Sequence, residues 1–227
     1  MRALLLTTSV LMFALAMAAC DALVPTAIAP TAAPPAAPST SFSASPDMVV
    51  LTMVPGKNIA RYRVREQLAG VALPSDAIGS TDQISGTVVA KTDGTIVSTQ
   101  SKFTVNLSTL KSDQDQRDNF IKRSTLQTDR YPYATFVPTQ APGLPLTLPA
   151  SGEVSFKLVG DMTIRDVTKS VTWDVQGKVV DNHEATGIAT TNFNFAYFNL
   201  AIPSVARVLS IVDNIQLELD LDLKRAQ

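Results

Sequence analysis

The most regular feature of the chain is the alternation of apolar and polar residues in several separate segments. Near the C-terminus, five aliphatic residues alternate with glutamine and acidic residues: Ile215, Leu217, Leu219, Leu221 and Leu223. Successive side chains of a β-strand point to opposite faces, so this alternation predicts a strand with one apolar and one solvated face. Strands of the same kind are predicted at residues 61–69, 83–91, 95–107, 133–140, 153–158, 171–175 and 185–195.

These segments predict eight strands, several of them longer than the usual length of about 5–6 residues. Turn signals separate some of them: Thr92-Asp93-Gly94 is a hairpin signal of the Asp-Gly kind, and residues 181–183 mark another tight reversal. Eight antiparallel strands need their apolar face covered, and closure of the sheet into a barrel achieves this. The interior of such a barrel is filled by side chains or holds one small ligand. A two-sheet sandwich is the alternative.

Residues 111–124 break the alternation and predict the only helix, a short one. Ser112 is the candidate N-cap, acidic residues lie early in the segment and basic residues lie late, as suits the helix dipole. Phe120 and Ile121 are the expected buried contacts of this helix.

The N-terminal residues resemble a bacterial lipoprotein signal. Residues 1–19 have an arginine followed by an apolar stretch, and they end in Ala-Ala before Cys20, the only cysteine of the chain. We expect cleavage before Cys20 and acylation of its thiol, which would hold the protein at a membrane outside the cytoplasm, on the periplasmic or outer surface. An ordinary secretion signal cut near Ala19, with Cys20 unmodified, is the alternative.

Residues 20–46 are rich in Ala, Pro, Thr and Ser, a composition typical of an extended linker, and residues 47–227 form the predicted barrel domain. An outer-membrane barrel shows the same alternation of residues. A lipid anchor followed by a linker argues against that class, because an integral barrel needs neither.

Composition narrows the chemistry. The formal net charge is −1 and there is no run of Lys or Arg, so we expect no nucleic-acid partner. With one cysteine and one histidine, we predict no disulfide, no metal and no cofactor. No G-x-S-x-G motif occurs, and His183 lies among turn residues, so we predict no catalytic site. An enzyme acting on a lipid would need His183 or Asp118 in a catalytic pair that the sequence does not reveal.

Two motifs are similar to those of the YceI-like family. The first runs from Arg117-Asp118-Asn119-Phe120 to Tyr131-Pro132-Tyr133-Ala134-Thr135-Phe136, and the second is residues 160–171, GDMTIRDVTKSV. The resemblance spans roughly residues 61–223. The chain departs from the family pattern at Met162 and Asp166, in the late motif around residues 191–199, and at residues 73–81, which are expected to form an additional loop.

The resemblance implies an extended, lipocalin-like barrel with an apolar lumen, and a binding function. The expected ligand is a long-chain amphiphile of the isoprenoid or quinone class, with a homodimer as a possible assembly. For the Arg117-Asp118 motif it implies that Arg117 or Asp118 fastens the helix to one end of the barrel; contact of Arg117 with an anionic head group is the alternative.

Twelve residues are predicted to line the lumen, although each could equally be ordinary core: Phe103, Val105, Phe120, Phe136, Phe156, Leu158, Trp173, Val175, Phe193, Phe195, Leu217 and Leu219. The alternative function is that of a structural or protein-interaction lipoprotein whose barrel is filled by side chains.

Overall fold

The computed structural model describes residues 47–145, 149, 151–181 and 183–226. The predicted signal sequence, Cys20 and the linker lie outside the described residues. In the described part of the chain, no helix is both long enough and apolar enough to span a membrane.

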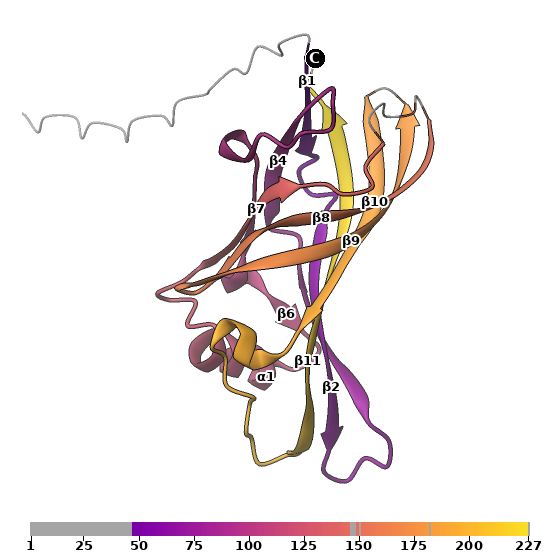
Figure 1. Cartoon of the computed structure of the whole chain (residues 1–227). Helices are drawn as coiled ribbons and strands as arrows, with labels where there is room; N and C mark the ends of the chain where they lie inside the picture. The colour runs from indigo at the N-terminus through magenta and orange to yellow at the C-terminus, as the bar shows by residue number, and fades with distance from the viewer. Residues whose placement is uncertain (1–46, 146–148, 150, 182, 227) are drawn as a thin grey trace, which may run out of the picture. The chain divides into compact units, whose positions relative to one another are not determined.

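The domain is one antiparallel sheet that closes on itself (Figure 1). The ring closes because β1 pairs with both β4 and β11, and it contains eight strands, the number that the alternation predicts. In order around the ring these are β1 (Met48–Met53), β4 (Ile84–Lys91), β5 (Lys102–Asn106), β7 (Tyr133–Gln140), β8 (Gly152–Ile164), β9 (Val167–Asp181), β10 (Glu184–Phe193) and β11 (Val208–Arg225). One of them, at Met48–Met53, was not predicted, and the predicted strand at 61–69 lies outside these eight.

Three more strands lengthen one end of the barrel: β2 (Ile59–Leu68), β3 (Ser75–Thr81) and β6 (Lys111–Ser112). The long strand β11 pairs with β2 from Val208 to Asp220, and its last residues pair with β1. β1 and β2 are therefore successive halves of one broken strand, and β3 and β4 are related in the same way. The barrel is elongated because β1 and β2 together pair along almost the full length of β11.

A buried asparagine repairs the break between β1 and β2. Asn58 is 1% exposed, and its amide nitrogen donates to the carbonyl oxygen of Val54 at 2.6 Å. Its Oδ1 atom accepts a hydrogen bond from the backbone N–H of Asp222 in β11 at 2.8 Å. The side chain thus satisfies backbone groups that the interrupted strand leaves without a ladder partner, as buried polar groups require.

The expectation of a loop at residues 73–81 is wrong for most of that segment, because Ser75–Thr81 forms β3. The segment does alternate, with Ala77, Gly79 and Thr81 buried and their neighbours more exposed. Its buried residues are small or polar, so the hydrophobic pattern does not reveal them. Gly79 lies opposite Tyr62 in β2, and a side chain there would collide with the tyrosine ring, which a Cβ atom would approach to 2.2 Å.

The predicted strand at 95–107 is shorter than expected. After the predicted turn, where Gly94 has a φ of +83°, Ile96 makes one bridge to Ala90 before the 3-10 turn η1 (Ser98–Gln100) interrupts the segment. Only β5 continues as a regular strand. The side chain of Ser101 explains the interruption, because its hydroxyl accepts a hydrogen bond from the backbone N–H of Val89 at 2.9 Å in place of a ladder partner.

The predicted helix is α1 (Asp115–Phe120), which continues into the π-helical turn η3 (Ile121–Thr125). Ser112 is not its N-cap. That position belongs to Gln114, because Ser112 lies in β6 and pairs with Gly79 of β3. The 3-10 turns η2 (Leu107–Thr109) and η4 (Phe195–Phe198) complete the elements.

Apolar residues from all eight strands of the ring, together with β2 and the turns η2, η3 and η4, form one core inside the barrel. Its centre contains Phe103, Phe136 and Trp173. The ring of Phe136 lies 6.5 Å from that of Phe103 and meets Trp173 edge-on at 6.1 Å, distances typical of favourable aromatic pairs.

Candidate ligand-binding cavity

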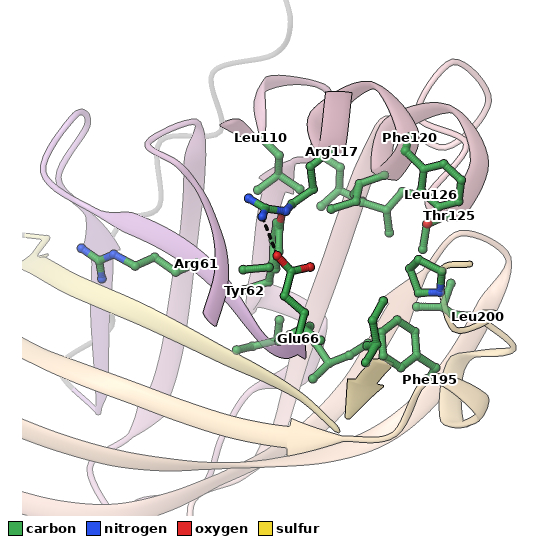
Figure 2. A pocket seen from close by; sticks show the side chains of 18 of the residues that line it. Arg61, Tyr62, Glu66, Leu110, Arg117, Phe120, Thr125, Leu126, Phe195 and Leu200 are labelled. Atoms are coloured by element: carbon green, nitrogen blue, oxygen red, sulfur yellow. Dashed lines mark hydrogen bonds and ion pairs between the residues drawn. The ribbon is translucent and has the colours of Figure 1, made fainter. Parts of the chain in front are cut away.

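The barrel is not completely filled by its own side chains. A cavity of about 710 Å³ lies inside it, within the range of about 300–1,000 Å³ that is usual for small-molecule sites. Its wall is formed by β2 to β5 and β7 to β11, together with α1 and the turns η2, η3 and η4. Figure 2 shows α1, with Arg117 and Phe120, on one side of the cavity and Phe195 and Leu200 on another.

Most of the residues predicted to line the lumen lie in this wall: Phe103, Val105, Phe120, Phe136, Trp173, Phe193, Phe195, Leu217 and Leu219. The other three, Phe156, Leu158 and Val175, belong to the core and lie outside the cavity wall. Phe156 pairs with Val175, and Leu158 with Trp173, along the long hairpin of β8 and β9. The apolar face of this hairpin extends beyond the cavity.

Several wall residues were not predicted. Aliphatic residues among them come from short elements or turns, where no alternation exists to reveal them: Leu107, Leu110, Ile121, Leu126 and Leu200. Others follow the alternating faces already recognised and could have been included on that signal: Ile84, Ala134, Met162, Ile164 and Ile215. Polar residues also contribute to the wall, and Tyr62, Glu66 and Arg117 are among them.

The cavity opens at the end of the barrel where exposed residues line it, among them Asp113, Gln114 and Gln116 in and before α1. Its lining also includes the exposed residues Ala69 and Val71 after β2, and 205–207 before β11. The backbone N–H of Ala69 donates to the carbonyl oxygen of Arg207 at 2.9 Å, which joins these last two segments. A ligand therefore has a defined entrance at this end of the barrel.

Glu66 and Arg117 form an ion pair in the wall near this entrance (Figure 2). The Nη2 atom of Arg117 lies 2.7 Å from the Oε1 atom of Glu66, and the two side chains are 17% and 7% exposed. Arg117 also pairs with Asp113. Burial would lower the pKa of Arg117, but hydrogen bonds and attraction from Asp113 and Glu66 raise it above its ordinary value. The guanidinium is therefore held charged beside an apolar cavity.

Tyr62 lies in the wall close to this ion pair. Burial raises the pKa of its phenol to about 12, and the positive charge of Arg117 opposes part of that rise. The phenol is consequently neutral at physiological pH, so it presents an O–H group that can donate to or accept from a ligand.

The helix is fastened to the barrel, as the resemblance implied, and both residues of the Arg-Asp motif contribute. Arg117 binds Glu66 of β2. Asp118 is buried, and its Oδ1 atom accepts from the backbone N–H of Ser112 at 2.9 Å and from its hydroxyl at 2.6 Å. Adjacent residues on a helix diverge, so one contacts β2 and the other β6.

A donor within the wall has no protein partner. Trp173 is 3% exposed, and among the described residues its indole N–H makes no hydrogen bond. A buried donor left unpaired costs about 1–3 kcal/mol. An oxygen acceptor on a bound ligand would relieve that cost.

The remaining candidate residues lie away from this cavity. His183 is exposed in the connection from β9 to β10, where its backbone N–H and that of Glu184 donate to Asp181 at 2.7 and 2.9 Å. Asp181 thus stabilises the reversal. No group of three or more His, Cys, Asp or Glu residues suited to a metal ion occurs in the described part of the chain.

A closed antiparallel barrel with an apolar cavity defines the lipocalin-like class of β-proteins. Within that class, residues 58–223 match the YceI-like domain. The match covers well over half of the chain, and the protein belongs to the YceI-like family. A comparison with curated protein sequences found no match.

Solved structures agree in fold. A polyisoprenoid-binding domain from Saccharophagus degradans is 11% identical, with a TM-score of 0.61 over 78% of this chain and 98% of that chain. BcnA from Burkholderia cenocepacia is 14% identical, with a TM-score of 0.52 over 77% and 99%. A YceI protein from Campylobacter jejuni is 13% identical, with a TM-score of 0.54 over 71% and 91%. These solved chains contain little beyond the barrel, so a barrel of this fold forms without further segments.

Proposed function

We propose that this protein binds one long-chain amphiphile, of the isoprenoid or quinone class, inside its barrel, and that acylated Cys20 tethers it to a membrane outside the cytoplasm. The observation that carries the binding proposal is the cavity of about 710 Å³ with a mainly apolar wall. The polyisoprenoid-binding domain of Saccharophagus degradans, which has the same fold, supports the ligand class. The cavity argues against the alternative function, that of a structural or protein-interaction lipoprotein whose barrel is filled by side chains.

The apolar wall provides affinity without polar contacts. Each buried methylene contributes about 0.8 kcal/mol, so a chain with roughly a dozen buried carbons gains about 10 kcal/mol before the cost of ordering it. Such a ligand suits a wall in which Phe103, Phe136 and Leu217 expose their apolar surface to the cavity.

The polar end of the ligand is expected at one of two places. Tyr62, Glu66 and Arg117 offer hydrogen-bonding groups near the entrance, and the unpaired indole N–H of Trp173 offers a donor in the wall. Both favour a ligand that carries a hydroxyl or carbonyl oxygen over a pure hydrocarbon. Binding needs no chemical step, so we propose a carrier and not an enzyme.

Fluorescence of the single tryptophan provides a direct test, because Trp173 lies in the cavity wall. The chain of residues 47–227 is titrated with a prenol and with a short-chain ubiquinone, and the same protein is examined by native mass spectrometry and solvent extraction. We expect saturable quenching by the ubiquinone and a hydrophobic adduct on protein purified from cells. Empty protein in repeated preparations, with no response to either compound, would overturn the proposal.

A cavity-filling variant makes the test specific. Ala134 is buried in the cavity wall, and Ala134→Phe should lower the affinity at least roughly tenfold by occupying the space of the ligand. Ile188→Phe is the matched control, because Ile188 is 48% exposed on β10 and outside the cavity wall. Equal effects of the two substitutions on ligand affinity would count against binding in the cavity.

The tether is tested separately in cells. The unaltered chain should incorporate labelled palmitate and fractionate with membranes, whereas Cys20→Ser should incorporate none. Label retained by Cys20→Ser, or absent from the unaltered chain, would exclude acylation of Cys20.

A further inference from the structure

Apolar side chains that the fold leaves exposed lie on one side of the cavity entrance. We define the apolar rim as Val71, Leu73, Ile202, Val205, Leu209 and Val212, which are between 37% and 76% exposed. Leu73 and Leu209 are the most exposed, at 76% and 68%. Monomeric soluble proteins rarely leave such groups of large apolar residues together in water, and contiguous patches usually mark an interaction site.

The rim is one structural feature, although its residues come from two parts of the sequence. Val71 and Leu73 lie in the connection between β2 and β3, Ile202 and Val205 lie in the segment that leads into β11, and Leu209 and Val212 lie in the first residues of β11. The hydrogen bond from Ala69 to Arg207 and the pairing of Leu68 with Val208 hold the two parts side by side. In Figure 1 both form the same end of the barrel, remote from the start of β1.

The charge of the rim indicates what covers it. Residues 68–75 contain no charged side chain, and residues 199–212 contain only Arg207. Acidic side chains follow directly after both stretches: Asp76 pairs with Arg63 and Arg65, and Asp213 accepts a hydrogen bond from the backbone N–H of Phe195. Farther along β11 the outer face is acidic, with Glu218, Asp220 and Asp222. An apolar surface whose one charge is positive is complementary to the acyl chains and anionic head groups of a bilayer.

We infer that the apolar rim docks the barrel on a membrane surface that contains anionic lipid, with the cavity entrance facing the acyl chains. A hydrophobic ligand could then pass between bilayer and cavity without crossing water. The ligand part of this inference rests on the proposed function, whereas docking does not.

The chain before the barrel is long enough to allow this orientation for a protein anchored at Cys20. β1 starts at the opposite end from the rim, because its partners in β11 are the last residues, Leu223–Arg225. An 18-residue strand such as β11 spans about 60 Å. Residues 20–46, if fully extended, reach at most about 80 Å. An anchor at the far end therefore does not prevent the rim from meeting the same membrane.

Vesicle flotation tests the docking with residues 47–227, a chain that lacks Cys20. We expect flotation with phosphatidylethanolamine vesicles containing about 30% phosphatidylglycerol, and weaker flotation with pure phosphatidylcholine. Leu73→Ser with Leu209→Ser should reduce partitioning at least roughly tenfold, since binding scales with buried apolar area. Neither residue lines the cavity, so the affinity for a ubiquinone added without vesicles should remain unchanged.

The control replaces exposed apolar residues elsewhere on the barrel. Val180 and Ile188 are 47% and 48% exposed, on β9 and β10. Val180→Ser with Ile188→Ser should float like the unaltered protein. Equal loss in both double variants, or no flotation of the unaltered protein, would overturn the inference.

Sedimentation separates a membrane from a second copy of the chain. The unaltered protein could be a dimer that does not float and that becomes a monomer when Leu73→Ser and Leu209→Ser are combined. This result would assign the rim to self-association and overturn docking. Flotation by a protein that binds no isoprenoid or quinone would support docking and refute only the proposed cargo. A monomer that floats and loads quinone from vesicles through the rim would support both.

Discussion

At the scale of single residues, the barrel depends on polar side chains that replace missing backbone partners. Asn58 joins β1 to β2 by pairing with Val54 and Asp222 at 1% exposure. Asn58→Ala removes the partner of the Asp222 N–H and one of the two partners of the Val54 carbonyl oxygen, so we expect a loss of about 2 kcal/mol in the free energy of unfolding. Urea denaturation measures it.

The control for this prediction is Asn106→Ala. Asn106 also accepts a backbone hydrogen bond, from the N–H of Ser108 at 3.0 Å, but in an exposed setting where water can replace it. Its removal should cost less than about 1 kcal/mol. Equal losses for Asn58→Ala and Asn106→Ala would refute the role given to Asn58.

The raised pKa of Tyr62 predicts that the stability of the fold decreases at alkaline pH. Its pKa is raised to about 12 by burial, above the ordinary value of 10.0. The folded state therefore holds the phenolic proton more tightly than the unfolded state does. The resulting stabilisation is complete below pH 10 and is lost as the pH rises toward 12.

Urea unfolding between pH 9 and about 11.5 should show this loss, with a shallower decline in Tyr62→Phe. Tyr133 is 53% exposed, so Tyr133→Phe should retain the decline of the unaltered protein. A decline that is identical in all three proteins would show that other groups cause it.

Some residues of the cavity wall could be predicted from the sequence, and others could not. Phe103, Phe136 and Leu217 could be assigned to the cavity wall because strand alternation separates inward from outward positions. Alternation cannot show where along a strand the cavity ends. Phe156 and Val175 were therefore assigned to the cavity wall although they lie outside it. Glu66 gave no signal, since an acidic residue in a half-polar strand looks solvated until its partner in another element is known.

At the scale of elements, α1 is stabilised mainly by ion pairs to its surroundings, because the helix is too short to be stable by itself. The helix has six residues, too few to be stable alone. The ion pair from Arg117 to Glu66 attaches it to β2 in a nearly buried setting. Removing one partner leaves the other charge buried, which is more costly than losing an exposed pair.

We therefore expect Glu66→Ala to lower the free energy of unfolding by about 2–3 kcal/mol, less than the full cost of breaking a wholly buried pair because Arg117 keeps Asp113. Lys157→Ala breaks the exposed pair with Asp174 and should cost less than about 1 kcal/mol. Chemical denaturation compares the two. A loss no larger in Glu66→Ala than in Lys157→Ala would contradict the role of the buried pair.

The elements that the sequence missed share a physical cause. β3 escaped notice because Ala77 and Gly79 carry its buried face, and small residues give almost no hydrophobic signal. β1 also escaped notice, because Met48–Met53 is apolar at nearly every position and therefore shows no alternation. The long strands β8, β9 and β11 were foreseeable since their alternation continues for many residues.

At the scale of the whole molecule, an apolar cavity links stability to ligand binding. A ligand that binds only the folded barrel, at 100 times its dissociation constant, adds about 2.7 kcal/mol to the free energy of unfolding. For a domain of this size the midpoint of thermal unfolding should rise by about 5–10 °C.

Differential scanning fluorimetry with a saturating ubiquinone tests this rise. Ile188→Phe should show the same increase, and Ala134→Phe should show little. A shift that is as large in Ala134→Phe as in the unaltered protein would mean that the ligand binds elsewhere.

The course of folding follows from the dual pairing of β11. Leu51 pairs with Arg225, and Arg61 pairs with Glu218, so the chain's first and last strands must meet before the barrel can close. Nearly the whole domain lies between these partners, and contacts of such high sequence separation form slowly. An emerging polypeptide cannot complete its ring until the final strand is available. If the chain is exported as we propose, a ring that closes this late keeps the polypeptide open during its passage through a secretion channel.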